Sequence, residues 1–356
     1  MFAALRRDFW LAPVTFSLLA ASVLLFFAAE LSQSNDGESG GRRAFGAVEG
    51  RRFEVEVSGP FDLWNGPWWR WVRIPASAFH HANLLHLFCN VSTLWFLGPL
   101  MERRMRRTAY LGFWFFSATV PLLPEYYLDH YPIGLSGVAC AMFGWCLIER
   151  QYDAALAWRL NDRVVRSFWM FLFLFLGLSA IGWLPIANVA HFVGVGYGWL
   201  NARASRHRNG RMAWIAAHAV LPLAIYGVLH PFWNARYHAF LGRTAQNADG
   251  LSAGVPHFRE AVRRDSGLPK VWLSLAAEQA SQGDRLSAWK LAIEGLQHNR
   301  SSEELAEFAR TVWRFLPEQD HEAAREVLRL AFEEDAPSWS KNLRMAGPST
   351  EESLGR

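Results

Sequence analysis

Long uncharged runs fill the first two thirds of the chain and are absent from its last third. Before residue 236 the uncharged windows are 17 to 36 residues long, and the longest is divided at Trp183-Leu184-Pro185. A membrane-spanning helix needs about 20 largely apolar residues. The pattern therefore predicts seven spans, at about 9–29, 80–101, 108–124, 132–148, 167–185, 187–202 and 212–233.

The first and the last of these windows leave an alternative open. The first follows Arg6 and Arg7 and could be a signal peptide, although it is long for one and lacks a clear small-x-small cleavage site. The seventh contains Pro222 and Pro231. If it crosses the membrane, the C-terminal part lies outside; if it lies only in the interface, that part is cytoplasmic.

The distribution of arginine predicts the orientation. The loops after the second, fourth and sixth spans each hold four Arg, whereas the loop at 125–129 holds two acids and no base. Cytoplasmic loops carry an excess of Lys and Arg, so we expect a cytoplasmic N-terminus. The long outer loop, 30–73, ends in four Trp together with Arg70 and Arg73. Such a segment suits headgroup depth, either as a membrane anchor or as a contact for a substrate.

The last third has an amphipathic helical pattern over about 241–338. Its residues match the positions of a tetratricopeptide repeat, whose period is 34, and partial matches precede and follow this unit. We therefore expect a soluble, repeat-like helical region that binds a peptide or protein partner, with a generic helical bundle as the alternative. The composition of 344–356 predicts a disordered tail. The residues that match the tetratricopeptide positions are Trp272, Leu275, Ala276, Gly283, Ala288 and Ala292.

Composition separates the same two parts. The first 233 residues hold 20 Arg, no Lys and 14 acids, while the remainder carries a net charge of −2 within an overall +4. Only 19% of the chain is charged, below the roughly 25% of soluble domains. A wholly soluble domain, a disordered chain and a disulfide framework are excluded. Basic residues flank the spans, which gives no support for nucleic-acid binding, and no phosphate loop or zinc-ligand spacing appears, so we expect no cofactor and no metal.

Polar residues inside spans are costly and are therefore functional candidates. Three clusters fall in the outer halves of the second, fourth and sixth spans. Polar groups at a similar depth can converge on one buried, hydrated site. The clusters consist of His80, His81, His86 and Asn90; of Gly134-Leu135-Ser136-Gly137; and of Asn188 and His191.

Helical spacing places two of these clusters on stripes of small residues. Ser136 and Cys140 share one face, and His191, Gly194 and Gly198 share another. Small stripes allow membrane helices to approach closely. Packing them together would bring the Ser136 hydroxyl within reach of the His191 imidazole, which is the nucleophile–base pair of acyl transfer.

His86 and Asn90 lie four residues apart on one helix face and could donate hydrogen bonds to an oxyanion. Structural alternatives remain at this stage. A lone Ser in a membrane helix usually bonds to its own backbone, and small-residue stripes often serve packing alone. His80, His81, His86 and His191 could instead form a zinc site, although no carboxylate accompanies them within a span.

In this order and spacing, the residues resemble the rhomboid intramembrane serine proteases. The motif is His81-x4-His86-x3-Asn90, then Gly98 and Glu102-Arg103, then Gly134-Leu135-Ser136-Gly137, then Asn188-x2-His191-x2-Gly194-x3-Gly198. The resemblance implies an all-α polytopic membrane protein: a membrane domain over 1–235 with six core helices and a seventh span, followed by the small soluble helical region.

By the same resemblance, Ser136 is the nucleophile and His191 the general base of a dyad without an acidic member. His86, Asn90 and the Ser136 amide would form the oxyanion hole beside Leu135. His81, Glu102 and Asn188 would be supporting residues, together with Gly134, Gly137, Gly194 and Gly198. Arg70 or Arg73 matches the Trp-Arg motif of the first outer loop. Where family members carry an aromatic residue four positions after the serine, this chain has Cys140.

The function expected from this resemblance is cleavage of transmembrane protein segments within the lipid bilayer. The substrate would approach between the second and fifth spans and unwind locally. A non-catalytic membrane adaptor or chaperone that binds such segments is the alternative, and Cys140 favours it slightly. A transporter is a third class, but no inverted repeat is present. We expect a multi-pass protein of a bacterial inner membrane with its site open to the outer side.

Overall fold

The computed structural model describes residues 12–35, 63–128 and 130–332, and every regular element within these ranges is a helix. The prediction of an all-α chain is confirmed. The described residues form two compact units, one ending at His230 and one beginning at Pro231. The start of the first predicted span, most of the long loop 30–73 and the predicted tail at 344–356 lie outside the described residues.

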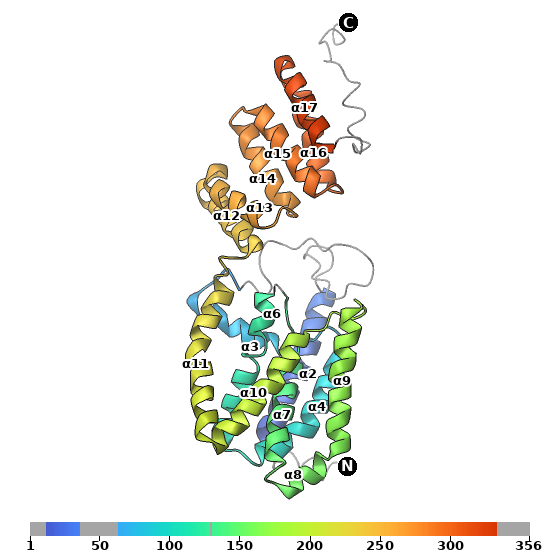
Figure 1. Ribbon diagram of the computed structural model, residues 1–356, viewed down its shortest axis with the longest axis vertical. Helices are drawn as coiled ribbons and strands as arrows, with labels where there is room; N and C mark the ends of the chain where they lie inside the picture. Colours follow the sequence, from blue (N-terminus) through green and yellow to red (C-terminus); the bar gives the residue numbers. More distant parts are fainter. Residues whose placement is uncertain (1–11, 36–62, 129, 333–356) are drawn as a thin grey trace. The chain divides into compact units, whose positions relative to one another are not determined.

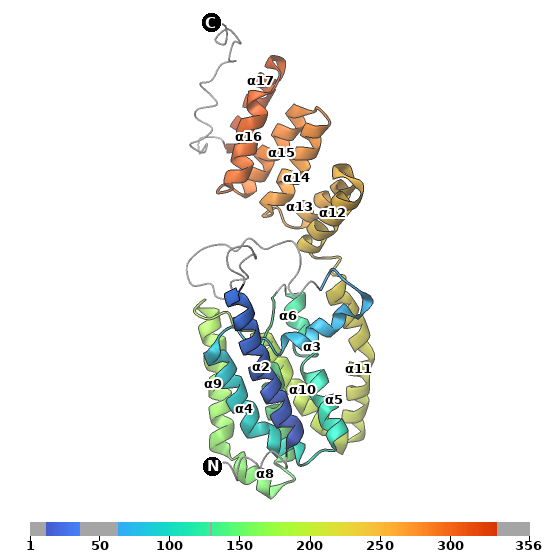
Figure 2. The ribbon, with the colours of Figure 1, turned by 180° about the vertical axis from the view of Figure 1, so that it is seen from behind.

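The first unit is a bundle of helices of unequal length (Figures 1 and 2). Short helical turns precede or connect the longer helices. The long members are α2 (Pro13–Asn35), α4 (Leu84–Glu102), α9 (Asp162–Ala180), α10 (Asn188–Arg206) and α11 (Arg208–Leu229). The shorter ones are η2 (Trp68–Val72), α3 (Arg73–Ser77), α5 (Arg107–Ser117), α6 (Leu123–Tyr127), α7 (Ser136–Glu149) and α8 (Ala154–Arg159).

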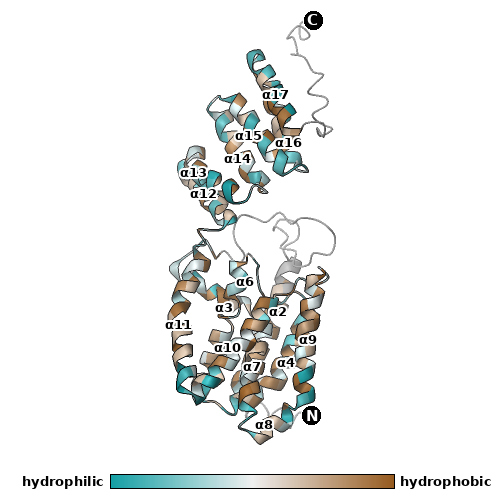
Figure 3. Cartoon of the chain, viewed as in Figure 1, coloured by the Kyte–Doolittle hydropathy of each residue, from teal (hydrophilic) through white to brown (hydrophobic). Residues whose placement is uncertain are grey.

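Several of these helices have the length and composition of membrane spans. In the part of the chain that the structure describes, α4, α9 and α11 are long and apolar enough to cross a membrane, and Pro13–Ala29 and Ser136–Glu149 are shorter apolar helices. Apolar residues predominate along α9 and α11, whereas polar residues gather at the ends of these two helices that lie towards α8 (Figure 3). The helices α4, α9 and α11 could cross a membrane by length and composition, and the seven crossings stay a prediction.

The predicted helices differ from the observed ones at their ends. The fifth, sixth and seventh, predicted over 167–185, 187–202 and 212–233, are Asp162–Ala180, Asn188–Arg206 and Arg208–Leu229. The second begins at Leu84 rather than near residue 80, because the Asn83 side chain accepts the His86 N–H and caps α4 there. His80 and His81 therefore precede the helix. The helix predicted over 108–124 ends at Ser117, and turns lead from it into α6, which has Pro near its start. The fourth begins at Ser136 rather than at 132.

The tightest contact in the first unit joins α7 and α10. A Cβ atom at Gly198 would lie 1.7 Å from the Ala141 carbonyl oxygen, and one at Gly144 would lie 2.0 Å from that of Val195. Only glycine permits this approach between the two backbones. Twelve of the fourteen residues of α7 are buried, so α7 is the central helix of the bundle.

A buried carboxylate fixes the start of α2. Glu102, at the end of α4, accepts the Val14 and Thr15 backbone N–H groups at 2.9 and 2.8 Å and the Thr15 hydroxyl at 2.7 Å. These amides belong to the first turn of α2 and have no partner within the helix. The Thr15 hydroxyl also bonds Tyr110 on α5. Glu102 therefore joins three helices at the end of the bundle.

The Trp-rich segment forms η2 and runs directly into α3. Trp68 is 82% exposed and Trp69 is 50% exposed, as suits rings at headgroup depth. Arg70 donates to the Gly66 carbonyl and bonds the His230 ring, and Arg73 donates to the Asn65 carbonyl. The two arginines thus hold the segment to itself and to the end of α11.

The second unit is a succession of packed helices with its own core. Its helices are α12 (Ala235–Asp249), η3 (Leu251–Gly254), α13 (Val255–Arg264), α14 (Pro269–Ser281), α15 (Arg285–His298), α16 (Glu303–Arg314), η4 (Glu318–Asp320) and α17 (His321–Phe332). Hydrogen bonds join Asn299 to Ser266, Gln297 to Ala331 and Trp289 to Ala324, pairs that lie 33 to 35 residues apart. This spacing matches the predicted period, and assignment to the tetratricopeptide repeats stays a prediction.

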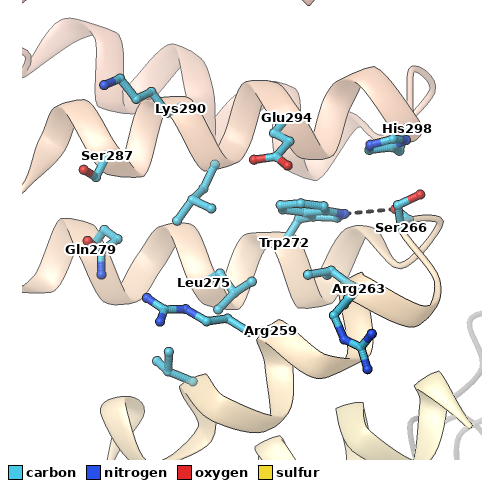
Figure 4. Close-up of a pocket in the computed structure, with 13 residues that line it drawn as sticks. Arg259, Arg263, Ser266, Trp272, Leu275, Gln279, Ser287, Lys290, Glu294 and His298 are labelled. Atoms are coloured by element: carbon cyan, nitrogen blue, oxygen red, sulfur yellow. Dashed lines mark hydrogen bonds between the residues drawn. The ribbon is translucent and has the colours of Figure 1, made fainter. Parts of the chain in front are cut away.

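A groove of about 520 Å³ lies over α13, α14 and α15 of this unit (Figure 4). Trp272 and Leu275 of α14 form its apolar floor, and the Trp272 indole N–H donates to the Ser266 carbonyl. The rim carries Arg259, Arg263, Lys290, Glu294 and His298. Its charges are thus mostly positive, although this part of the chain is acidic as a whole.

Candidate active site

Ser136 is the first residue of α7. The preceding Leu135 is fully buried, and Gly134 adopts a φ of +95°, a backbone conformation that residues with a side chain rarely adopt. This turn leads the chain into α7. It leaves Ser136 half-buried at the start of α7, where first-turn N–H groups have no helical partner.

His191 lies one turn into α10 and bonds Ser136 directly. Ser136 Oγ and His191 Nε2 are hydrogen-bonded at 2.8 Å. The imidazole is 6% exposed, and its Nδ1 has no hydrogen-bond partner among the described residues. The close packing of α7 and α10 fixes this geometry, because Gly194 places α10 where a Cβ would lie 2.6 Å from the Gly137 carbonyl oxygen.

Two polar side chains of α4 face the turn before Ser136. A Cβ atom at Gly134 would lie 2.6 Å from His86 Nε2 and 3.1 Å from Asn90 Nδ2. Asn90 is buried, and its Nδ2 has no hydrogen-bond partner in the described part of the chain. His86 Nδ1 accepts the Ala82 N–H at 3.4 Å, so the neutral ring carries its proton on Nε2. Two donors therefore lie against the Gly134 turn.

The other predicted residues occupy supporting positions. His81 bonds the Phe79 carbonyl oxygen, and its ring lies 5.1 Å from that of His86. Asn188 begins α10 and donates to the Ile186 carbonyl oxygen. Cys140 is buried against Gly194, 3.1 Å from where a Cβ at that glycine would lie. Glu102 is bound to the start of α2 rather than to Ser136 or His191.

Two residues near His191 were missed by sequence reasoning. Glu125, on α6, is 1% exposed and accepts the Ala190 backbone N–H at 3.1 Å. The sequence pattern places Glu125 in an outer loop, and its only signal is a charged residue next to the apolar run 108–124. Phe175, on α9, has its ring centroid 6.5 Å from that of His191. Within 12–35, 63–128 and 130–332, no three His, Cys, Asp or Glu side chains are placed to hold a metal ion.

Comparison with known proteins matches the segment that carries this geometry. Residues 65–207 match a family model described as Rhomboid domain. These residues are a rhomboid domain.

Curated relatives agree with this assignment. The chain is 34% identical over 137 residues to a "Rhomboid protease GlpG" of Yersinia pestis, strain Pestoides F. These aligned residues make up 38% of this chain and 47% of the relative. It is also 34% identical over 152 residues to a protein of the same name from Serratia proteamaculans. This alignment covers 39% of this chain and 49% of the relative. The chain therefore spans about half the length of the curated relatives that it matches. Ser136, His191 and the donors on α4 all lie within the rhomboid domain.

Proposed function

We propose that this protein is an intramembrane serine endopeptidase with Ser136 as its nucleophile and His191 as its general base. The observation that carries the proposal is the 2.8 Å hydrogen bond between the Ser136 hydroxyl and His191 Nε2, inside the rhomboid domain. A serine hydroxyl becomes an effective nucleophile when a base takes its proton. In this geometry no rearrangement is needed before that transfer.

The proposed reaction has two stages. Ser136 Oγ attacks the scissile carbonyl carbon while His191 accepts the hydroxyl proton, and the imidazolium then protonates the leaving amine. A water molecule, deprotonated by His191, next hydrolyses the acyl-enzyme and regenerates Ser136. The backbone N–H of Ser136, Asn90 Nδ2 and His86 Nε2 are donors for the oxyanion. The unpartnered Asn90 amide supports this role, since a buried donor without a partner is costly unless a ligand uses it.

The substrate we propose is a transmembrane segment of another protein. The resemblance implies that it enters between the spans that correspond to α4 and α9. On α4, Leu84, Leu85 and Phe88 are 60%, 71% and 64% exposed, so apolar side chains near the donors are available to an apolar segment. A helical segment must unwind first, because its own hydrogen bonds shield the peptide bond.

We also propose the orientation and the domain organisation. The arginine-rich loops favour a cytoplasmic N-terminus and a site open to the outer side. The bacterial sources of the relatives favour a bacterial inner membrane. The membrane domain would extend over about 1–235, with the soluble helical region after it.

The groove of the second unit supports a peptide partner for this region. Arg259 and Lys290 on its rim and Leu275 on its floor suit an extended peptide with acidic and apolar side chains. Fluorescence anisotropy of a labelled acidic peptide with the full-length protein tests this. We expect Arg259→Glu with Lys290→Glu to abolish binding. Equal binding of a basic peptide would contradict the proposal.

Cleavage of single-span reporter proteins in proteoliposomes tests the proposed activity. We expect Ser136→Ala and His191→Ala each to reduce cleavage at least about 10³-fold without a loss of folded protein. Labelling of the wild type by a fluorophosphonate probe provides a second readout, because this reagent phosphonylates an activated serine and releases fluoride. The Ser136→Ala variant should remain unlabelled.

The adaptor alternative predicts a different outcome. Reporters would be captured by the wild type but not cleaved, and the probe would not label Ser136. Cys140 is the residue that favours this alternative, since it stands where the family carries an aromatic residue. In that case, reversion of Cys140 to Tyr would be the first variant to examine.

A further inference from the structure

Glu125 is a buried carboxylate for which the proposed reaction has no role. Its side chain, on α6, is 1% exposed. Oε1 accepts the Ala190 backbone N–H at 3.1 Å, and Oε2 accepts the His130 Nδ1–H at 2.8 Å. A buried carboxylate is costly unless hydrogen-bond donors or positive charges pair with its oxygens. Both oxygens have donors here, and one donor is the residue next to His191.

The bond to Ala190 closes the first turn of α10. Ala190 is the third residue of this helix, so its N–H has no partner within the helix. The N-cap residue, Ala187, supplies no side-chain acceptor. The next amide, that of His191, is the first to bond within the helix, to the Ala187 carbonyl oxygen. Glu125 therefore caps α10 from another helix, directly before His191, with a bond strengthened by its charge.

Glu125 is itself held in place by its neighbours on α6. The Tyr126 hydroxyl donates to Ser77, the last residue of α3, and the Tyr127 hydroxyl donates to the Ala224 carbonyl oxygen of α11. The Glu125 carbonyl oxygen accepts the His130 N–H at 2.9 Å. The short helix α6 is thus tied to two other parts of the unit, which gives the carboxylate a defined position.

The charge of Glu125 also acts on the imidazole. Among the described residues, Glu125 and His86 both interact electrostatically with His191. Its Nδ1 has no hydrogen-bond partner among the described residues, so Glu125 acts on the ring without a hydrogen bond to it. When His191 takes the Ser136 proton, the ring becomes positive, and a fixed negative charge in a poorly polarisable interior favours that state.

We propose that Glu125 is a positioning residue for His191: it fixes the backbone of α10 beside the imidazole and stabilises the imidazolium formed during proton transfer. This inference rests on the proposed function. It places an acidic group in the reaction that acts through helix geometry and charge rather than through a bond to the ring.

The test compares Glu125→Ala and Glu125→Gln with a matched control. Glu149 is also buried and also bonds α10, through Arg206 Nε at 3.1 Å. It lies at the other end of α7, about 20 Å from Ser136 along the helix. Glu149→Gln therefore removes a charge from the same helix pair, far from the dyad. For each variant we would measure kcat and KM on a single-span reporter in proteoliposomes, the rate of fluorophosphonate labelling, and Tm.

We expect Glu125→Ala to lower kcat and the labelling rate about 10²-fold, with KM within about twofold, because the base is misplaced and less stabilised. Glu125→Gln keeps an acceptor for the Ala190 N–H and loses the charge, so an intermediate loss of about tenfold is expected. Glu149→Gln should lower Tm while kcat stays within about threefold.

The remaining outcomes distinguish failure of the proposed function from failure of the role proposed for Glu125. A wild type that neither cleaves nor labels overturns the proposed function, whatever the Glu125 variants do. An active wild type whose Glu125→Ala variant keeps kcat within threefold overturns the positioning role alone. An equal loss of kcat in Glu149→Gln would assign Glu125 to stability only. If Glu125→Ala does not fold, Glu125→Gln decides, because a kcat equal to the wild type would contradict the role of the charge.

Discussion

The helix pair α7–α10 and the single helix α9 are held in the same bundle by different means. Twelve of the fourteen residues of α7 are buried, whereas Leu172 is the one buried residue among the nineteen of α9. Backbone meets backbone between α7 and α10, at Gly144, Gly194 and Gly198. The contacts of α9 are made by side chains instead.

Aromatic rings and one ion pair attach α9 to the rest of the unit. Phe168 stacks on Phe143 of α7, with ring centroids 3.7 Å apart. Arg150, at the end of α7, donates to Asp162 at the start of α9. Farther along, Phe175 approaches His191 at 6.5 Å. The attachment is therefore strongest in the first half of α9.

This difference separates two requirements of the proposed reaction. The Ser136–His191 bond needs a fixed geometry, and contacts between backbones supply it because they cannot adjust by rotating a side chain. Entry of a transmembrane segment needs a part of the bundle that can move. A helix with few buried side chains can be displaced at a lower free energy. The comparison predicts that α9 tolerates changes that α7 and α10 do not.

The largest effect is expected from Gly198→Ala. Its Cβ would lie 1.7 Å from the Ala141 carbonyl oxygen, so α10 must move away from α7 and the Ser136–His191 hydrogen bond must break. We expect cleavage and probe labelling to fall at least about 10²-fold, and the unfolding free energy to fall by about 3 kcal/mol. Thermal unfolding and labelling rates would measure both quantities.

Gly196→Ala is the matched control for this change. It lies two residues away on the same helix, and a Cβ there would have nothing within 4 Å. Its stability and labelling should stay close to those of the wild type. Equal losses in the two variants would show that the helix, rather than the contact with α7, requires glycine.

A smaller effect is expected from Phe168→Leu. The substitution removes the stacked ring from Phe143, and stacked aromatic pairs contribute about 1 kcal/mol beyond their buried area. We expect Tm to fall by a few degrees, while the rate of probe labelling stays within about twofold because α9 does not hold the dyad. Phe171→Leu, at a side chain that is 51% exposed, is the control and should change neither quantity. A large loss of labelling in Phe168→Leu would contradict the comparison.

The smallest effect is expected at Asp153, in the connection from α7 to α9. Arg104 bonds this carboxylate at 2.7 Å, and the Leu156 N–H bonds it at 2.9 Å; together they lower its pKa to about 2. The unfolded chain has the ordinary value of about 4. Because the folded pKa is the lower one, the stabilisation is present above about pH 4 and disappears as the pH falls towards 2.

Asp153→Asn tests this statement. We expect a small decrease of Tm at neutral pH, which vanishes between pH 4 and 2. The difference is small because the pair is partly exposed. An unchanged difference across this pH range would show that the charge of Asp153 does not contribute.

The family and the all-α class could be predicted from the sequence, because both depend on local features: apolar windows and short motifs. Helix ends could be predicted less well. The start of α4 depends on a cap by Asn83, which outweighs the apolar character of the residues before it. The break after Ser117 falls within an uncharged window, so hydropathy alone contains no sign of it.

Around Ser136 and His191, spacing predicted the stripes that carry both residues, since helical periodicity fixes which residues share a face. It did not predict Glu125, which lies 65 residues before Ala190 in the chain. Nor did it predict Phe175, which reaches His191 from a helix that carries none of the motif residues. Neither belongs to a local pattern.

By itself, the sequence determined where apolar helices form and which side chains share one face of each, because both follow from hydrophobicity and a period of 3.6 residues. Only the tertiary structure decided which faces meet. Contact between α7 and α10 depends on glycines whose missing side chains matter only when two backbones approach. The bond from Glu125 to α10 likewise depends on a chain fold that brings the short helix α6 to the first turn of α10.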